Sequence, residues 1–145
     1  MKYYTVLAYK NKINGDLVFN CTALNTFGIK ASTKYLEMIT SPYSIEYVGT
    51  KLMESFHLCM KEPNWNKEIS GSVSVALGYK NYKKFLNDFL HVSINWSVDE
   101  DILEIEPMGN DGKSYVGINK KIMFKSLADR REIGQCLVNA FSECR

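Results

Sequence analysis

The apolar residues near the end of the chain follow the period of an amphipathic α-helix. From position 133 onward they recur at steps of three and four, and they are Ile133, Leu137, Ala140, Phe141 and Cys144. Asp129 precedes this pattern, and Glu132 stands three positions after Asp129. This arrangement is similar to the capping box that starts many helices. We therefore predict a closing helix that packs one face against a core.

The same pattern occurs earlier in the chain. Residues 34–59 align with residues 119–144 without gaps at an offset of 85, and Ser44, a common N-cap residue, falls on Asp129. Identical residues occupy the paired positions Met38 and Met123, Ser41 and Ser126, Gly49 and Gly134, Leu52 and Leu137, Phe56 and Phe141, and Cys59 and Cys144. We interpret this as a possible internal strand–helix repeat, with convergence of helix patterning as the alternative.

Alternating apolar and polar residues predict strands elsewhere, and turn signals separate them. We expect strands at residues 3–9, 17–24, 34–40, 73–77, 91–96, 102–106, 115–118 and 121–124, and further helices at residues 44–61 and 81–89. Asn14-Gly15 is a strong hairpin signal, and residues 109–112 predict a turn. Because strands outnumber helices and no linker divides the chain, we predict one α+β domain, residues 1–145. Its two main helices would cover a mainly antiparallel, curved sheet.

Composition supports a single globular domain. The chain has 145 residues, of which 46% are hydrophobic and 23% are charged. It has no signal-peptide pattern and no run of about 18 apolar residues, so we expect a cytoplasmic protein without a membrane partner. The four cysteines, Cys21, Cys59, Cys136 and Cys144, form no C-x-x-C motif. We expect all four to be free thiols in a reducing compartment.

Residues that carry catalytic chemistry are few and scattered. Neither His57 nor His91 has a nucleophile and an orienting acid nearby in the sequence. Two isolated histidines do not supply the three or four ligands of a metal site. Gly112-Lys113-Ser114 is similar to the end of a phosphate-binding loop, but Pro107 stands where that motif needs glycine. We therefore expect no enzyme, no cofactor and no small-molecule substrate.

An acidic stretch is the most distinctive charge feature. Six acids occur without an intervening lysine or arginine, and they are Asp99, Glu100, Asp101, Glu104, Glu106 and Asp111. Strand alternation puts Glu104 and Glu106 on one face, and Leu103 and Ile105 on the core face. The stretch is either a solvated edge that charge protects from aggregation, or a surface for a basic partner. Acid–base catalysis by a carboxylate pair is a third interpretation.

A basic, aromatic stretch precedes the acids. Its residues are Tyr79, Lys80, Tyr82, Lys83 and Lys84. Aromatic side chains among lysines can bind nucleic acid, which makes a small nucleic-acid-binding module the alternative function. Since acidic and basic residues are nearly balanced, 16 against 18, we favour a solvated helix face and expect no nucleic-acid partner.

Four motifs in the second half of the chain resemble one protein family. They are L-G-x-K-x-x-K-x-F at residues 77–85, V-x-I at residues 92–94, L-x-I-x-P at residues 103–107, and E-I-G-x-x-L-x-x-A-F at residues 132–141. Leu103 stands where we would expect isoleucine. With these motifs, roughly the last seventy residues look like the immunity proteins of bacterial contact-dependent growth inhibition (CDI) systems. Through the repeat, the resemblance extends to the first helix.

The resemblance implies a small cytoplasmic protein that is not an enzyme. Such a protein binds and neutralises the C-terminal toxin domain, often a nuclease, of a large secreted protein. The acidic stretch would suit a basic nuclease cleft, although the net charge of the chain is +2. Trp65 and Trp96 are candidate aromatic anchors for the toxin, with core packing as their alternative role. Strand addition at an exposed edge is a second way to bind, and the resemblance carries over no particular binding residue.

Overall fold

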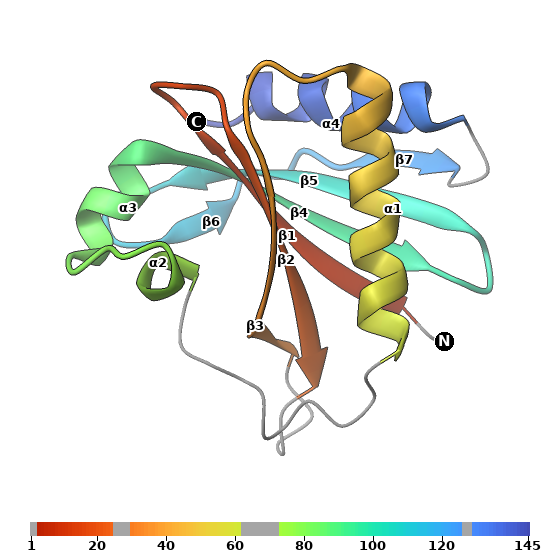
Figure 1. The fold of residues 1–145 in the computed structure, drawn as a ribbon, viewed down its shortest axis with the longest axis horizontal. Coiled ribbons are helices and arrows are strands. Elements are labelled where there is room, and N and C mark those ends of the chain that lie inside the picture. The colour runs from red at the N-terminus through yellow and green to blue at the C-terminus, as the bar shows by residue number, and fades with distance from the viewer. Residues whose placement is uncertain (1–2, 25–29, 62–72, 126–128) are drawn as a thin grey trace.

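The computed structural model describes residues 3–24, 30–61, 73–125 and 129–145, which form a curled antiparallel sheet with helices on both faces (Figure 1). The strands are β1 (Tyr3–Asn11), β2 (Leu17–Leu24), β3 (Lys30–Ile39), β4 (Phe89–Ser97), β5 (Ile102–Asn110), β6 (Tyr115–Gly117) and β7 (Ile122–Lys125). The helices are α1 (Ile45–Lys61), α2 (Val73–Ala76), α3 (Tyr82–Asp88) and α4 (Arg130–Ser142). Among the described residues the strand order is β3-β2-β1-β4-β5-β6, with β7 also paired to β5. The α+β fold class is confirmed.

Two local predictions need correction. The strand predicted at residues 73–77 is wrong, because Val73–Ala76 form α2 and the Leu77 amide donates to the Val73 carbonyl, 3.0 Å away. Alternating V-S-V-A suits a short helical turn as well as a strand, and Gly78, with φ of 86°, ends the turn. The turn predicted at residues 109–112 begins later, because β5 continues through Asn110.

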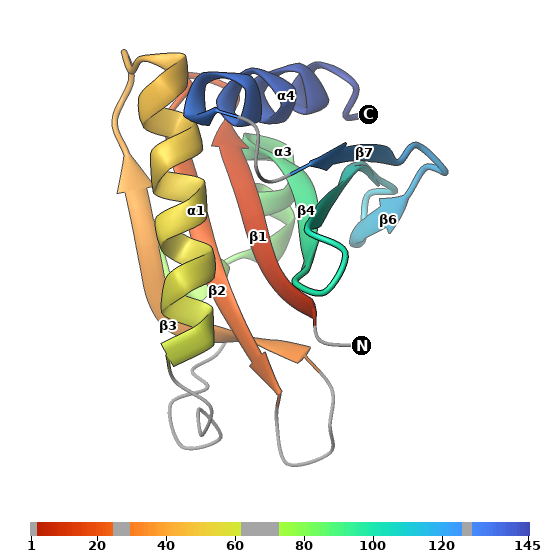
Figure 2. The ribbon, with the colours of Figure 1, turned by 90° about the vertical axis from the view of Figure 1, so that its right-hand side faces the viewer.

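Helices α1 and α4 pack on one face of the sheet and share its main core (Figure 2). Both begin at the predicted caps. The Ser44 hydroxyl accepts the Tyr47 amide at 3.1 Å, and the Asp129 carboxylate accepts the Glu132 amide at 2.8 Å. The helices bury their apolar stripes against inward side chains of β1, β2, β4 and β5. Fully buried side chains of this core are Val6, Phe19, Leu52, Phe56, Ile94, Leu103, Ile105, Ile133 and Leu137.

The two main helices cross at the glycines that the repeat pairs. A Cβ on Gly49 would overlap the carbonyl oxygen of Arg130, and a Cβ on Gly134 would overlap the carbonyl oxygen of Ile45. The two contacts correspond to each other at the offset of 85. Backbone therefore packs directly on backbone at the crossing, which any larger residue would prevent.

Strand pairing repeats in the same way. Adding 86 to both numbers turns the β1–β2 pair Val6↔Cys21 into the β4–β5 pair Val92↔Pro107. With the offsets of 86 for β2 and 85 for β3, Leu17↔Ile39 becomes Leu103↔Phe124 of β5 and β7. The chain thus consists of two similar β-β-β-α halves that meet where β1 pairs with β4. The predicted strand–helix repeat is therefore present in the structure and also includes the preceding hairpins.

The segment between the halves covers part of the opposite face of the sheet. There α2 and α3 form a second, smaller core with outward residues of β1, β2 and β4. Its buried side chains are Tyr9, Val18, Val73, Phe85 and Phe89. Asn81 caps α3 by accepting the Lys83 amide at 2.9 Å. This insertion is the main difference between the two halves.

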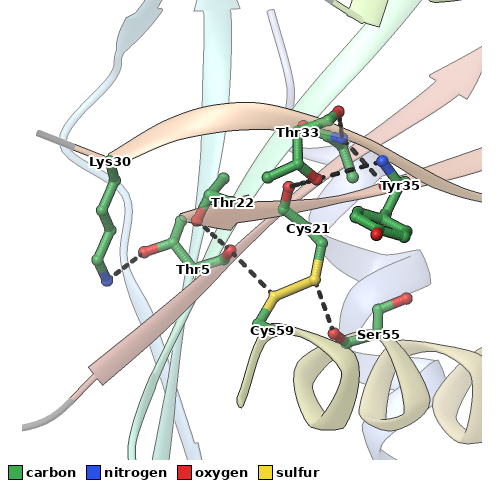
Figure 3. Close-up of a disulfide and its surroundings, with 9 residues drawn as sticks. Thr5, Cys21, Thr22, Lys30, Thr33, Tyr35, Ser55 and Cys59 are labelled. Atoms are coloured by element: carbon green, nitrogen blue, oxygen red, sulfur yellow. Dashed lines mark hydrogen bonds between the residues drawn. A yellow bond between two sulfur atoms is a disulfide. The ribbon is translucent and has the colours of Figure 1, made fainter. Parts of the chain in front are cut away.

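The cysteine prediction is wrong for two residues. Cys21 on β2 and Cys59 on α1 form a disulfide, which ties the first main helix to the sheet (Figure 3). The Cys59 Sγ lies 3.9 Å from the Thr5 carbonyl oxygen, and the Cys21 Sγ lies 3.1 Å from that of Ser55. The two sulfur atoms meet because a core strand faces a helix stripe, which the cysteine spacing does not indicate. Cys136 and Cys144 are free, as expected.

The helix crossing leads to a first prediction. Gly134→Ala should lower the free energy of unfolding by about 1–3 kcal/mol, because the added methyl group must separate two packed backbones. Gly117→Ala is the matched control, since its Cβ would stand 3.6 Å from the Glu106 carboxylate, an ordinary contact. Urea unfolding curves measure both variants. Equal stability of the two variants would contradict the close crossing.

Candidate functional site

A groove of about 410 Å³ lies on the sheet face that α1 and α4 do not cover. It occupies the part of this face that α2 and α3 leave open. Strand β4 begins at Phe89, which stacks on Phe85 of α3, and ends at Ser97 in the groove. The lining residues come from β1, β4, β5, β7 and the β4–β5 turn, and they are Tyr3, Asn95, Ser97, Glu100, Ile102, Glu104 and Met123.

Strand register fixes the groove floor. One row of directly paired residues crosses four strands, from Thr5 to Asn95, Glu104 and Met123. Neighbouring strands lie about 4.8 Å apart, so Thr5 and Glu104 are roughly 10 Å apart across the sheet. A parallel row begins at Tyr3 and continues through Ser97 and Ile102. The floor is therefore a mainly polar surface formed by paired strands.

The two ends of the groove differ in charge. At the β5 end, Glu104 pairs with Lys121 at 3.2 Å, and this hydrogen bond raises the pKa of Lys121. The side chain of Lys121 is 57% exposed, so the ion pair is weak and open to exchange. Glu100 lines the same end. The acids of this end are thus accessible to a cation from another molecule.

A lysine lies next to Tyr3, just beyond the opposite end of the groove. The Lys30 ammonium donates to the Thr5 hydroxyl and to the Tyr3 carbonyl, both at 2.9 Å, and lies 3.6 Å from the centre of the Tyr3 ring. Burial lowers the pKa of Lys30 to about 8. The Thr5 hydroxyl donates to Asn95 Oδ1. In the described residues, the buried hydroxyl of Ser97 has no hydrogen-bond partner. This hydroxyl lies beneath the groove surface and not on it.

The structure divides the six predicted acids instead of bringing them together. Glu100 and Glu104 line the groove, Asp99 is exposed in the adjoining turn, and Glu106 follows Glu104 on the same strand face. The predicted strand alternation is confirmed, because Leu103 and Ile105 are fully buried.

Two of the acids accept hydrogen bonds from residues close to them in the chain. Asp101 accepts the indole N–H of Trp96 at 3.1 Å. Asp111 accepts the amides of Lys113 and Ser114, both at 2.8 Å, and these hydrogen bonds lower its pKa. Asp111 also lies beyond the far end of β5, a strand of nine residues or about 30 Å. It is therefore remote from the groove.

The two tryptophans have different outcomes. Trp96 is only 9% exposed and packs edge-on against Phe56, with ring centres 5.7 Å apart. It therefore belongs to the main core, and its use as an aromatic anchor stays a prediction. Trp65 lies outside the described residues.

The basic, aromatic stretch is partly committed to the fold. The Tyr79 hydroxyl donates to the Asp88 carboxylate at 2.7 Å, and its ring packs edge-on against Phe85 and Phe89. Lys84 also pairs with Asp88, at 3.4 Å. Tyr82 remains 44% exposed, beside exposed Lys80 and Lys83. Of the aromatic and basic residues that suggested nucleic-acid binding, one tyrosine and two lysines therefore remain exposed and take no part in these contacts.

A second groove, of about 390 Å³, lies between α1 and the edge strand β3. Its acids are Glu37 and Glu54, and Lys51 pairs with both, at 3.2 and 3.1 Å. Because one lysine already bridges the two carboxylates, this groove offers less acidic charge to a partner. We therefore take the groove at Glu104 as the candidate site.

Sequence reasoning missed most of the groove floor. Asn95 and Ser97 are unremarkable strand residues, and Tyr3 and Met123 stand far apart in the chain. Alternation could have assigned each to an outward face. Only the successive pairing of β1 with β4, of β4 with β5 and of β5 with β7 brings them into one groove.

His91 lies in the second core, away from the groove. It is 6% exposed, stacks on Tyr9 with ring centres 4.4 Å apart, and donates from Nδ1 to the Ala8 carbonyl at 2.9 Å. Burial lowers its pKa to about 4. The histidine is therefore neutral near pH 7 and serves packing.

Among the helices of the described residues, none combines the length and the apolar character needed to cross a membrane. In the same residues, no three His, Cys, Asp or Glu side chains gather in a way that could hold a metal ion.

Comparisons with known proteins agree with the fold. A family model described as CDI immunity protein matches residues 32–144. A protein of unknown function from Neisseria meningitidis has a TM-score of 0.76 and 16% identity, over 99% of this chain and 96% of the other. A chain of a CdiA-CT/CdiI toxin and immunity complex from Yersinia pseudotuberculosis has a TM-score of 0.69 and 13% identity, over 100% and 99%. At these identities the structural likeness shows the fold alone. No curated protein matches the chain.

Buried His91 leads to a prediction about pH. Its pKa is lower in the folded state, about 4, than the usual 6.5, so folding opposes its protonation. The free energy of unfolding that depends on neutral His91 is fully present above pH 6.5. It decreases as the pH falls toward 4, by up to about 3 kcal/mol. His91→Gln should flatten the loss of stability between pH 6.5 and 4 in urea titrations. His57→Gln, at an exposed histidine, is the control, and the same pH slope in both variants would contradict this role of His91.

Proposed function

Since the chain belongs to the CDI immunity protein family, we propose that it binds the C-terminal toxin domain of its own CDI system and holds that domain inactive. The observation that carries the proposal is the family match over residues 32–144. This range includes both main helices and the groove strands β4, β5 and β7. A fold neighbour described as part of a toxin and immunity complex supports a protein toxin as the partner.

We expect the toxin domain to be a nuclease. A nuclease must attract phosphates, so its cleft carries positive charge. The open carboxylates of Glu100 and Glu104 offer such a cleft a complementary surface. Because the net charge of the chain is +2, attraction would depend on this local charge and not on the charge of the whole molecule.

Protection requires only binding, and we propose no reaction for this chain. Among the described residues, His91 is buried against Ala8 and His57 lies on the exposed side of α1. We expect the complex to form in the cytoplasm, where a nuclease toxin meets its substrate. A toxin held over the groove is then prevented from reaching nucleic acid.

Growth measurements test the proposed function. The toxin domain encoded directly upstream of this chain's gene should arrest growth when expressed alone and should permit growth when this chain is co-expressed. An immunity protein from an unrelated CDI system is the matched control and should not protect. Continued arrest in the presence of this chain, or a gene with no toxin-encoding neighbour, would refute the proposal.

Association kinetics test the acidic groove. Glu104→Lys should slow association with the toxin domain about tenfold at low salt, because it reverses charge at the contact. Asp111→Lys should change the rate less, since Asp111 lies beyond the far end of β5. Glu143→Lys is the matched control, because Glu143 also pairs with one exposed lysine, Lys120, at 2.7 Å. Stopped-flow measurements that give equal rates for Glu104→Lys and Glu143→Lys would exclude the groove from the contact.

A further inference from the structure

The groove has a counterpart in the other half of the molecule. The offsets that relate the strands of the two halves, 86 for β1 and β2 and 85 for β3, also relate two rows of the outward face. The groove row is Thr5, Asn95, Glu104 and Met123. The counterpart row, equally paired across its strands, is His91, Tyr9, Val18 and Met38. The two rows are therefore similar positions on one sheet.

The counterpart row is occupied by the chain's own insertion. Phe85 of α3 packs on Tyr9, with ring centres 5.3 Å apart, and Val73 of α2 belongs to the same cluster as Val18. Tyr9, Val18, Phe85 and Val73 are each at most 7% exposed, whereas Met38 at the end of the row is 59% exposed. In the first half, the outward face of β1 and β2 is thus covered by a short segment of the same chain, which contains α2 and α3.

The groove row has the same geometry but a different floor. Polar Asn95 and Glu104 replace the apolar Tyr9 and Val18, and the site is an open groove of about 410 Å³. At the rim, Met123 is 59% exposed and Tyr3 is 50% exposed. The floor thus suits a polar occupant, and the rim offers apolar contact.

Charge defines the occupant further. Glu104 and Glu100 form the acidic end, and the ion pair of Glu104 with exposed Lys121 is weak enough to be replaced. An arginine could bind Glu104 through two parallel hydrogen bonds, which a lysine ammonium cannot do. At the other end, Lys30 would face a carbonyl or carboxylate of the occupant.

We propose that a projecting segment of the toxin domain fills this groove, as α2 and α3 fill its counterpart. The segment carries an arginine or lysine against Glu104 and Glu100, and an apolar side chain against Met123 and Tyr3. This inference rests on the proposed function and adds to it the place and the chemistry of the contact. The fold completes one of its two similar sites itself and leaves the other to the partner.

Two equivalent methionines provide the experiment. Met123 borders the groove, Met38 is its counterpart, and both are 59% exposed. Each is replaced in turn by p-benzoylphenylalanine, and the complex with the upstream-encoded toxin domain is irradiated. The residue at 123 should cross-link to the toxin domain at least tenfold more than the residue at 38. Mass spectrometry should locate the cross-link in one segment that contains an arginine or lysine.

A charge exchange then tests the chemistry. Glu replacing that toxin residue should weaken binding at least tenfold, and Glu104→Lys should restore most of the loss. Cross-linking from position 38 alone, cross-linking of two copies of this chain, or no recovery with Glu104→Lys would overturn the inference. In each of these cases, growth protection by the unmodified chain would leave the proposed function intact. Absence of any complex with the unmodified chain would instead refute the proposed function.

Discussion

The direct backbone contact between α1 and α4 is the constraint on which the rest of the structure depends. At Gly49 and Gly134 each helix presses against a carbonyl oxygen of the other, with no room for a side chain. Helices usually pack with axes 8–10 Å apart, and glycine permits the close end of this range. The close crossing lets both helices share one sheet face, so that their apolar stripes seal a single core over β1 and β4. The opposite face is thereby free to carry function.

On that face, the candidate binding groove lies where the two halves of the chain differ. Both halves provide a curved, three-stranded platform of the same register. The first platform has an apolar floor, with Tyr9 and Val18, and the chain covers it with α2 and α3. The second has a polar floor, with Asn95 and Glu104, and remains a groove. A small change of residue type at equivalent positions thus separates a core from a recognition surface.

The sequence contained most of the fold but only part of the candidate site. The periodicity of both main helices, their caps at Ser44 and Asp129 and the outward direction of Glu104 follow from local patterns, and the structure confirms them. Position 73 was mistaken because four residues cannot distinguish a strand from a helical turn. That Tyr3 and Met123 line one groove depends on strand register, whereas the separation of Asp111 from Glu104 results from β5 continuing to Asn110. Long-range pairing decides register, and no local pattern encodes it. The Cys21–Cys59 disulfide was missed for the same reason.

That disulfide also makes the halves dynamically unequal. In the second half, Pro107 stands at the position of Cys21, so the thiol of Cys144 has no sulfur to join and donates instead to the His91 carbonyl at 3.2 Å. Helix α1 is therefore covalently anchored, whereas α4 is held by packing and by non-covalent bonds near its C-terminal end. Local opening should need less free energy at α4 and the adjoining β7 than at α1, and amide protons there should exchange sooner with solvent. The groove wall at β7 thus belongs to the more adaptable half, and the anchored half acts as the rigid frame against which it can adjust.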